Sequence, residues 1–179
     1  HLSALHVLDA PVTGHGIDIV AAIEGIVVLE LAGLDVSNDD LAMLDATAVR
    51  WLIIRDTPEI DDAGLVHLRS LAEQLVYLDM SGTGVSGSGL AHLGEMSNLR
   101  ALKLSECPVV DRALDSLIGP KLACVDLSAT RITGATLGAL SECTRLRELY
   151  LDRTDVGEES LEHLTGIKTL EVVSLDGTA

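Results

Sequence analysis

A motif of three apolar residues recurs along the chain at a nearly constant spacing, and this spacing constrains the fold more than any other feature. The motif has the form LxxLxL, with an apolar residue in each of the three slots. Its copies begin at Leu2, Ile26, Val49, Leu75, Leu99, Leu122, Leu146 and Leu170, which are 24, 23, 26, 24, 23, 24 and 24 residues apart. A sustained period of this length is typical of a solenoid, in which each unit stacks on the next.

The rest of each unit is also patterned. The eleventh repeat position is aliphatic, at Val12, Val36, Val85, Val109, Ile132 and Val156, and at Ile60 after a one-residue insertion. Two leucines three residues apart follow in most units, as in Leu90 and Leu93, and this spacing suits one face of a short helix. Each unit is therefore predicted to be a strand, a turn and a short helix. Stacked units would form a right-handed α/β solenoid with about eight parallel strands on the concave face and helices on the convex face.

Three segments, LDMSGTGVSGSGLAHL, VDLSATRITGATLGAL and LYLDRTDVGEESLEHL, resemble leucine-rich repeats of a class that carries Thr where other classes have Asn or Cys. The resemblance covers nearly the whole chain and implies a horseshoe-shaped arc. It also implies that the ninth repeat position hydrogen-bonds the backbone of the adjoining turn, forming a ladder. The positions that match are Thr57, Thr83, Thr130, Thr154 and Thr178. Cys107 occupies the same position and is expected to be structural, whereas Ala10 and Leu34 depart from the pattern.

Composition limits the possible partners. The formal net charge is −16, which disfavours nucleic acid and anionic membrane surfaces. No segment has the roughly 18 uninterrupted apolar residues of a membrane helix, and the first residues lack a basic signal-peptide region. Three cysteines without metal-ligand spacing favour a reduced, intracellular protein.

Several residue groups have the elements of a chemical site, but each is better explained by structure. His67 and His92 are expected side by side on the convex surface, with too few ligands for a metal ion. The glycine-rich segment SGTGVSGSG lacks the GK[ST] of a phosphate loop and is expected to form turns. No GxSxG element accompanies the Ser, His and Asp residues. We therefore expect no catalysis, no cofactor and no metal.

Charged side chains are expected on the concave sheet. The acidic ones are Glu30, Asp79, Asp126, Glu148, Asp152 and Asp176, which could hold calcium where strands adjoin but are better interpreted as solvated charges. The basic ones are Arg50, Arg55, Arg100, Lys103, Arg147 and Arg153. The concave face is thus predicted to be mixed in charge.

The leading functional hypothesis is a non-enzymatic scaffold that binds another protein on its concave face. A second is the substrate-recognition arm of a larger enzyme, such as a ubiquitin ligase or a bacterial effector, because LSECTRLREL with Cys143 resembles the cysteine-containing repeats of F-box proteins. A third is a structural spacer without a focused binding site. Residues 1–179 are expected to form one domain of a longer protein, since neither end has a capping element.

The aromatic residues indicate where a partner would dock. Phe is absent, and Trp51, Tyr77 and Tyr150 all fall at outward-facing positions of the predicted concave strands. An aromatic centre with a polar rim is typical of a binding hot spot. The repeat that contains Trp51 is also the longest, at 26 residues. The predicted partner-binding residues are Trp51, Ile53, Arg55, Tyr77, Asp79, Lys103 and Tyr150.

Overall fold

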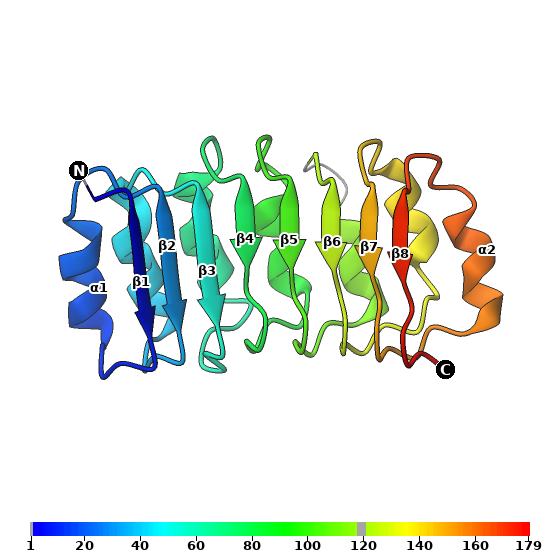
Figure 1. Ribbon diagram of the computed structural model, residues 1–179, viewed down its shortest axis with the longest axis horizontal. Coiled ribbons are helices and arrows are strands. Elements are labelled where there is room, and N and C mark those ends of the chain that lie inside the picture. Colours follow the sequence, from blue (N-terminus) through cyan, green and yellow to red (C-terminus); the bar gives the residue numbers. More distant parts are fainter. Residues whose placement is uncertain (1, 118–120) are drawn as a thin grey trace.

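The computed structural model describes residues 2–117 and 121–179, and within these ranges eight parallel strands form one open sheet. The strands follow one another in chain order, from β1 at one edge to β8 at the other (Figure 1). They are β1 (Ala4–Leu8), β2 (Val28–Ala32), β3 (Trp51–Arg55), β4 (Tyr77–Asp79), β5 (Ala101–Lys103), β6 (Cys124–Asp126), β7 (Glu148–Tyr150) and β8 (Val172–Ser174). Each of the eight strands begins two residues after a predicted motif start, so the predicted repeat is confirmed.

Short helices connect the strands. They are α1 (Gly14–Ala21), η1 (Asn38–Ala46), η2 (Gly64–Leu71), η3 (Ser88–Leu93), η4 (Asp111–Leu117), η5 (Leu137–Glu142), η6 (Glu158–Ser160) and α2 (Leu161–Leu164). The η segments are 3₁₀ helices, in which residues three apart eclipse one another. This geometry suits the paired leucines, because both then point toward the sheet. Ser37 and Asp40 form a capping box at the start of η1.

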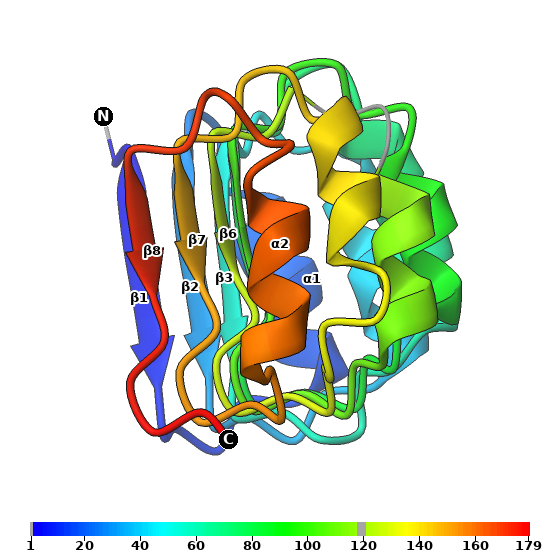
Figure 2. The same cartoon turned by 90° about the vertical axis from the view of Figure 1, so that its right-hand side faces the viewer.

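The molecule is a right-handed coil with the strands on its inner side. In Figure 1 the chain descends each strand, returns behind the sheet through a helix, and enters the next strand one step along. Figure 2 shows that β1 and β8 project farther from the helices than β3 and β6 do, so the sheet curves away from the helices at both ends. The sheet therefore lines the concave face, as predicted.

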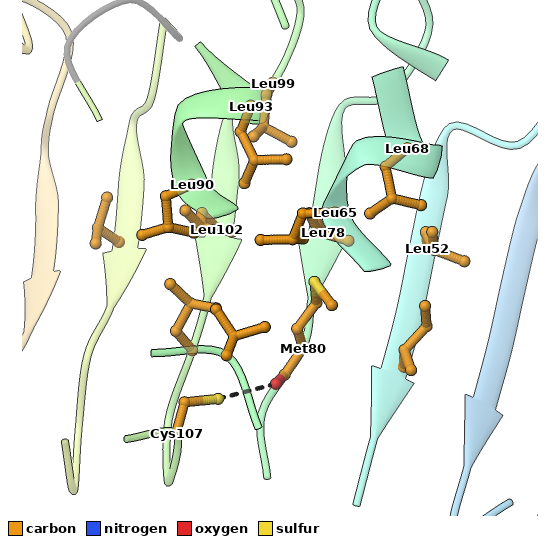
Figure 3. Close-up of a cluster of buried hydrophobic side chains, with 14 of the residues drawn as sticks. Leu52, Leu65, Leu68, Leu78, Met80, Leu90, Leu93, Leu99, Leu102 and Cys107 are labelled. Carbon is orange, nitrogen blue, oxygen red and sulfur yellow. Dashed lines mark hydrogen bonds between the residues drawn. The ribbon is translucent and has the colours of Figure 1, made fainter. Parts of the chain in front are cut away.

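The core lies between the sheet and the helices and is built from columns of equivalent residues. Leu52, Leu78 and Leu102 are in register on neighbouring strands and are fully buried. Leucines of η2 and η3 point toward them from the opposite side (Figure 3). Burying each leucine contributes about 1.5–3 kcal/mol, so this layer provides most of the stability. Leu161, in the last helix, is 38% exposed because no further repeat covers it in the described chain.

The turn that follows each strand has a left-handed residue at the eighth repeat position. Within the described ranges these residues are Asp9, Gly33, Asp56, Gly82, Glu106, Ala129, Arg153 and Gly177, with φ between 47° and 72°. This conformation costs a residue with a Cβ about 1 kcal/mol, and it ends the strand by turning the chain toward the convex side. The register of this turn is the same in all eight repeats.

The threonines at the ninth position differ from the expected ladder. Thr57 Oγ1 is buried without a hydrogen-bond partner in the described chain, and the other four bond carbonyls of their own repeat. Thr83, Thr130 and Thr154 donate their hydroxyl hydrogens to Met80, Leu127 and Leu151 O at 2.7, 2.6 and 2.6 Å, within their own repeat. Cys107 reaches the preceding repeat instead, because its Sγ lies 3.1 Å from Met80 O (Figure 3). Cys107 is buried, which supports the structural role predicted for it.

Candidate functional site

Trp51 and Tyr77 form an aromatic stack on the concave face. They are partners in register on β3 and β4, their ring centroids are 4.9 Å apart, and their planes differ by 11°. This separation is close to the spacing of neighbouring strands, so the stack runs across the sheet. Trp51 is 46% exposed, whereas Tyr77 is half-buried.

Lys103 extends the stack by one more strand. It lies on β5 with its Nζ 6.0 Å from the centroid of the Tyr77 ring, which is within reach of a cation–π interaction. Burial lowers the pKa of Lys103, but Tyr77 and Asp79 outweigh this effect, and the pKa is raised. Burial raises the pKa of Tyr77, and the charge of Asp79 raises it further. At neutral pH the stack therefore consists of an indole, a neutral phenol and a cation.

Asp79 belongs to the same surface but is not the solvated charge that was predicted. It is only 4% exposed. Its Oδ1 accepts hydrogen bonds from Ser81 N at 3.1 Å and Ser81 Oγ at 2.6 Å, and Tyr77 OH lies 3.4 Å from its Oδ2. The carboxylate thus fixes the end of β4 and the phenol beside it, which leaves it little capacity to bind a partner directly.

A second buried carboxylate corrects the same prediction. Glu30 on β2 is 8% exposed and sits between His6 on β1 and Arg55 on β3, with 2.6 Å separating its Oε2 from His6 Nδ1. Its Oε1 accepts a hydrogen bond from Arg55 Nη2. The pKa of Glu30 is lowered, mainly by the bond with His6; burial opposes this, and Arg55 reinforces it. Arg55 is therefore held by Glu30 at the edge of the aromatic stack.

The structure brings together six of the seven residues predicted to bind a partner. Ile53, Asp79 and Lys103 form one row across β3 to β5, directly beside the row of Trp51 and Tyr77. Arg55 follows Ile53 on β3 after one intervening residue. Tyr150 lies apart on β7, with its hydroxyl 3.1 Å from Glu148 Oε2. We call Trp51, Ile53, Arg55, Tyr77, Asp79 and Lys103 the aromatic surface.

His6 was missed by the sequence analysis, although a signal for it existed. It occupies the fifth repeat position, the same as Ile53 and Lys103, so the alternation of the strand places it on the concave face. The hydrogen bond between His6 and Glu30 depends on side chains that meet across strands, which the repeat alone does not specify.

The glycine-rich segment binds an anion that the chain itself supplies. The carboxylate of Asp62 accepts hydrogen bonds from Ser86 N at 3.2 Å, Gly87 N at 3.0 Å and Gly89 N at 2.9 Å. Burial raises the pKa of Asp62, but the bonds from Ser86, Gly89 and Gly87 outweigh it, so the pKa is lowered. The predicted role of these glycines in turns is correct, and the turn is fastened to the preceding repeat.

The two other cysteines have no features of a nucleophile. Cys143 is buried, with its Sγ 3.6 Å from Leu117 O, so its match to F-box repeats reflects a structural position. Cys124 is half-buried on the concave face, and burial together with Glu148 raises its pKa to about 11. At neutral pH it is therefore a thiol rather than a thiolate.

Within the described ranges, no group of three or more His, Cys, Asp or Glu residues could hold a metal ion. In the same ranges no helix has the length and apolarity needed to cross a bilayer. Comparison of the chain with protein-family models gives no match, and comparison with curated proteins gives none either. The function is therefore inferred from the geometry of the surface.

Proposed function

We propose that this chain is a leucine-rich repeat module that binds another protein through the aromatic surface and performs no chemistry of its own. The observation that carries this proposal is the stack of Trp51 on Tyr77, which stands exposed on a rigid concave sheet. Trp and Tyr dominate the binding energy of many protein interfaces because they bury a large apolar area at little entropic cost.

The neighbours of the stack make it prominent. In the same row, Val28 precedes Trp51 on β2 and Ala101 follows Tyr77 on β5. Both are smaller than the rings, so the rings stand above the surface on either side. A partner would therefore fit over the stack with apolar side chains against Val28 and Ala101.

The charges around the stack are suited to orienting a partner. Arg55 is held by Glu30, and Lys103 is held beside Tyr77, so both cations have defined positions before binding. Preorganised charges at the rim of an apolar centre favour specificity more than affinity. The net charge of −16 on the whole chain also favours a partner whose surface is basic outside the contact.

The sequence resemblance supports the same function, because solenoids of this kind present a broad, curved platform. No feature of the surface specifically favours the substrate-recognition arm of a larger enzyme.

The test is to compare Trp51→Ala with Met43→Ala in binding a purified partner. The partner would be identified with a photo-crosslinking residue in place of Ala101. Met43 is exposed on η1 to nearly the same degree as Trp51, so it controls for the loss of an exposed apolar side chain. We expect Trp51→Ala to weaken binding by about 2 kcal/mol or more, a factor of about 30, with no effect of Met43→Ala.

Stability must be measured on the same variants. Loss of the ring stack is expected to lower the free energy of unfolding by about 1 kcal/mol. Normal binding by Trp51→Ala would refute the proposal, as would a destabilisation of more than about 3 kcal/mol, which would identify Trp51 as a packing residue.

A further inference from the structure

A hollow of about 270 Å³ lies at the start of strands β5 to β7, at the upper edge of the sheet in Figure 1. It is separate from the aromatic surface. Its lining within the described chain consists of Arg100, Lys121, Ala123, Thr144, Arg145, Arg147 and Thr169. Four of the twelve Lys and Arg residues thus meet in one place, and no carboxylate is among these lining residues.

Backbone hydrogen bonds fix the floor of the hollow. Ala123 N donates to Arg100 O at 2.7 Å, and Arg147 N donates to Ala123 O at 2.8 Å. The three residues therefore lie side by side, each directly before its strand, with the small Ala123 between two arginines. Lys121 and Arg145 precede the same strands by a few residues and add two cations from the connecting loops.

The same rows elsewhere in the solenoid do not carry this charge. Arg50 and Arg100 flank Val76, which is larger than Ala123 at the same repeat position. The residues equivalent to Lys121 and Arg145 in the two preceding repeats are Gln74 and Asn98, which are uncharged. The hollow is therefore a local departure from the repeat and not a consequence of its period.

Contacts within the protein neutralise only part of the positive charge in the hollow. Arg147 forms an ion pair with Glu171 at 2.9 Å. Arg100 Nη1 donates to Ser97 O at 3.1 Å and Leu99 O at 3.2 Å, which fixes its guanidinium without neutralising it. Like charges that line one hollow repel one another, and an anion between them would relieve this repulsion. The hollow is thus a local concentration of positive charge on a chain of net charge −16.

We propose that the hollow binds a small, multiply charged phosphate compound, with Arg100, Lys121, Arg145 and Arg147 as its ligands. Guanidinium groups match phosphate oxygens in bidentate geometry, and lysine adds a point charge. The volume is below the roughly 300–1,000 Å³ of pockets that enclose drug-sized ligands, so it suits one or two phosphate groups rather than a whole nucleotide.

The experiment is an isothermal titration of the whole chain with sodium pyrophosphate at constant ionic strength. We expect saturable binding at one site, weakened about tenfold or more by Lys121→Gln or Arg145→Gln, since each removes a charge-assisted contact. Arg50→Gln is the matched control, because Arg50 occupies the same repeat position as Arg100 and Arg147 but lies outside the hollow. It should change the affinity less than twofold.

Two further measurements keep the proposal falsifiable. Ala123→Glu should abolish binding and raise the melting temperature at low salt, because its carboxylate would neutralise the surrounding cations. A parallel titration with citrate, which carries carboxylates instead of phosphates, should give at least tenfold weaker binding. The proposal is overturned if pyrophosphate does not saturate, if Arg50→Gln weakens it as much as Lys121→Gln, if citrate binds equally well, or if Ala123→Glu still binds.

Discussion

The contact between Asp62 and the following turn offers a sharp test of how neighbouring repeats are held together. Asp62 comes just before η2, and its carboxylate receives three backbone amides and the Ser86 hydroxyl from the next repeat. Asp62→Ala would remove all four bonds at once. It would leave the amides of Gly87 and Gly89, the two shortest of the backbone donors, without their acceptor.

The expected loss follows from these two amides. A hydrogen bond to a charged acceptor contributes about 1.5–3 kcal/mol, and the lower value applies here because water can reach part of the site. Two such bonds give about 3 kcal/mol for Asp62→Ala. For a chain of this size that corresponds to a fall in melting temperature of about 6–12 °C. Asp62→Asn keeps one acceptor oxygen but loses the charge, so we expect roughly half of this loss.

The assay is urea unfolding followed by far-UV circular dichroism, with Asp115→Ala as the control. Asp115 is exposed on η4 and should cost less than about 0.5 kcal/mol. Because the folded pKa of Asp62 is lowered, its contribution is full above the unfolded pKa and is lost as the pH falls through the folded pKa. The difference between the wild type and Asp62→Asn should therefore hold from pH 7 to about pH 5 and shrink below about pH 4. Equal losses for Asp62→Ala and Asp115→Ala, or a difference that persists in acid, would refute the reasoning.

Two other predictions concern the core and the concave cysteine. Leu102→Ala should lower the free energy of unfolding by about 3–4 kcal/mol because the side chain is fully buried, whereas Leu161→Ala should cost less than about 1.5 kcal/mol; similar values in denaturant titrations would contradict the buried column. Cys124, with its pKa raised to about 11, should react with iodoacetamide at pH 8 about a hundredfold more slowly than a free thiol. Glu148→Gln should speed that reaction, and a rate equal to that of glutathione would show that the thiol is not suppressed.

The repeat motif was sufficient to predict the strands and the core. Leu78, Leu102 and Leu149 occupy the second apolar slot of the LxxLxL motif, and the structure buries them in equivalent positions. The motif is sufficient because, once the units stack, each apolar slot faces the core between the sheet and the helices. The helices were less predictable: most are 3₁₀, a choice that depends on how few residues must span the convex side rather than on the identity of the leucines.

The candidate site was predicted in its position but not in its chemistry. Strand alternation placed Trp51 and Tyr77 on the same face, and their register follows from the repeat. Strand alternation could not show that Glu30 and Asp79 would form hydrogen bonds with neighbouring side chains. These bonds depend on His6, Arg55 and Ser81. The repeat position of a residue determines which face of the sheet its side chain points to. Whether a charge there meets water or another residue is decided by contacts between repeats.

The left-handed residue that ends each strand has a consequence for how this chain can vary. Glycine adopts that conformation without strain, yet Asp9, Asp56, Glu106, Ala129 and Arg153 occupy it in five of the eight described turns. Valine, isoleucine and threonine are the residues least able to follow, because branching at Cβ adds to the steric conflict. Among descendants of this sequence, the column should drift freely among glycine, asparagine and unbranched polar residues while excluding branched ones. Backbone geometry thus limits which substitutions are tolerated at a surface position that makes no contribution to the core.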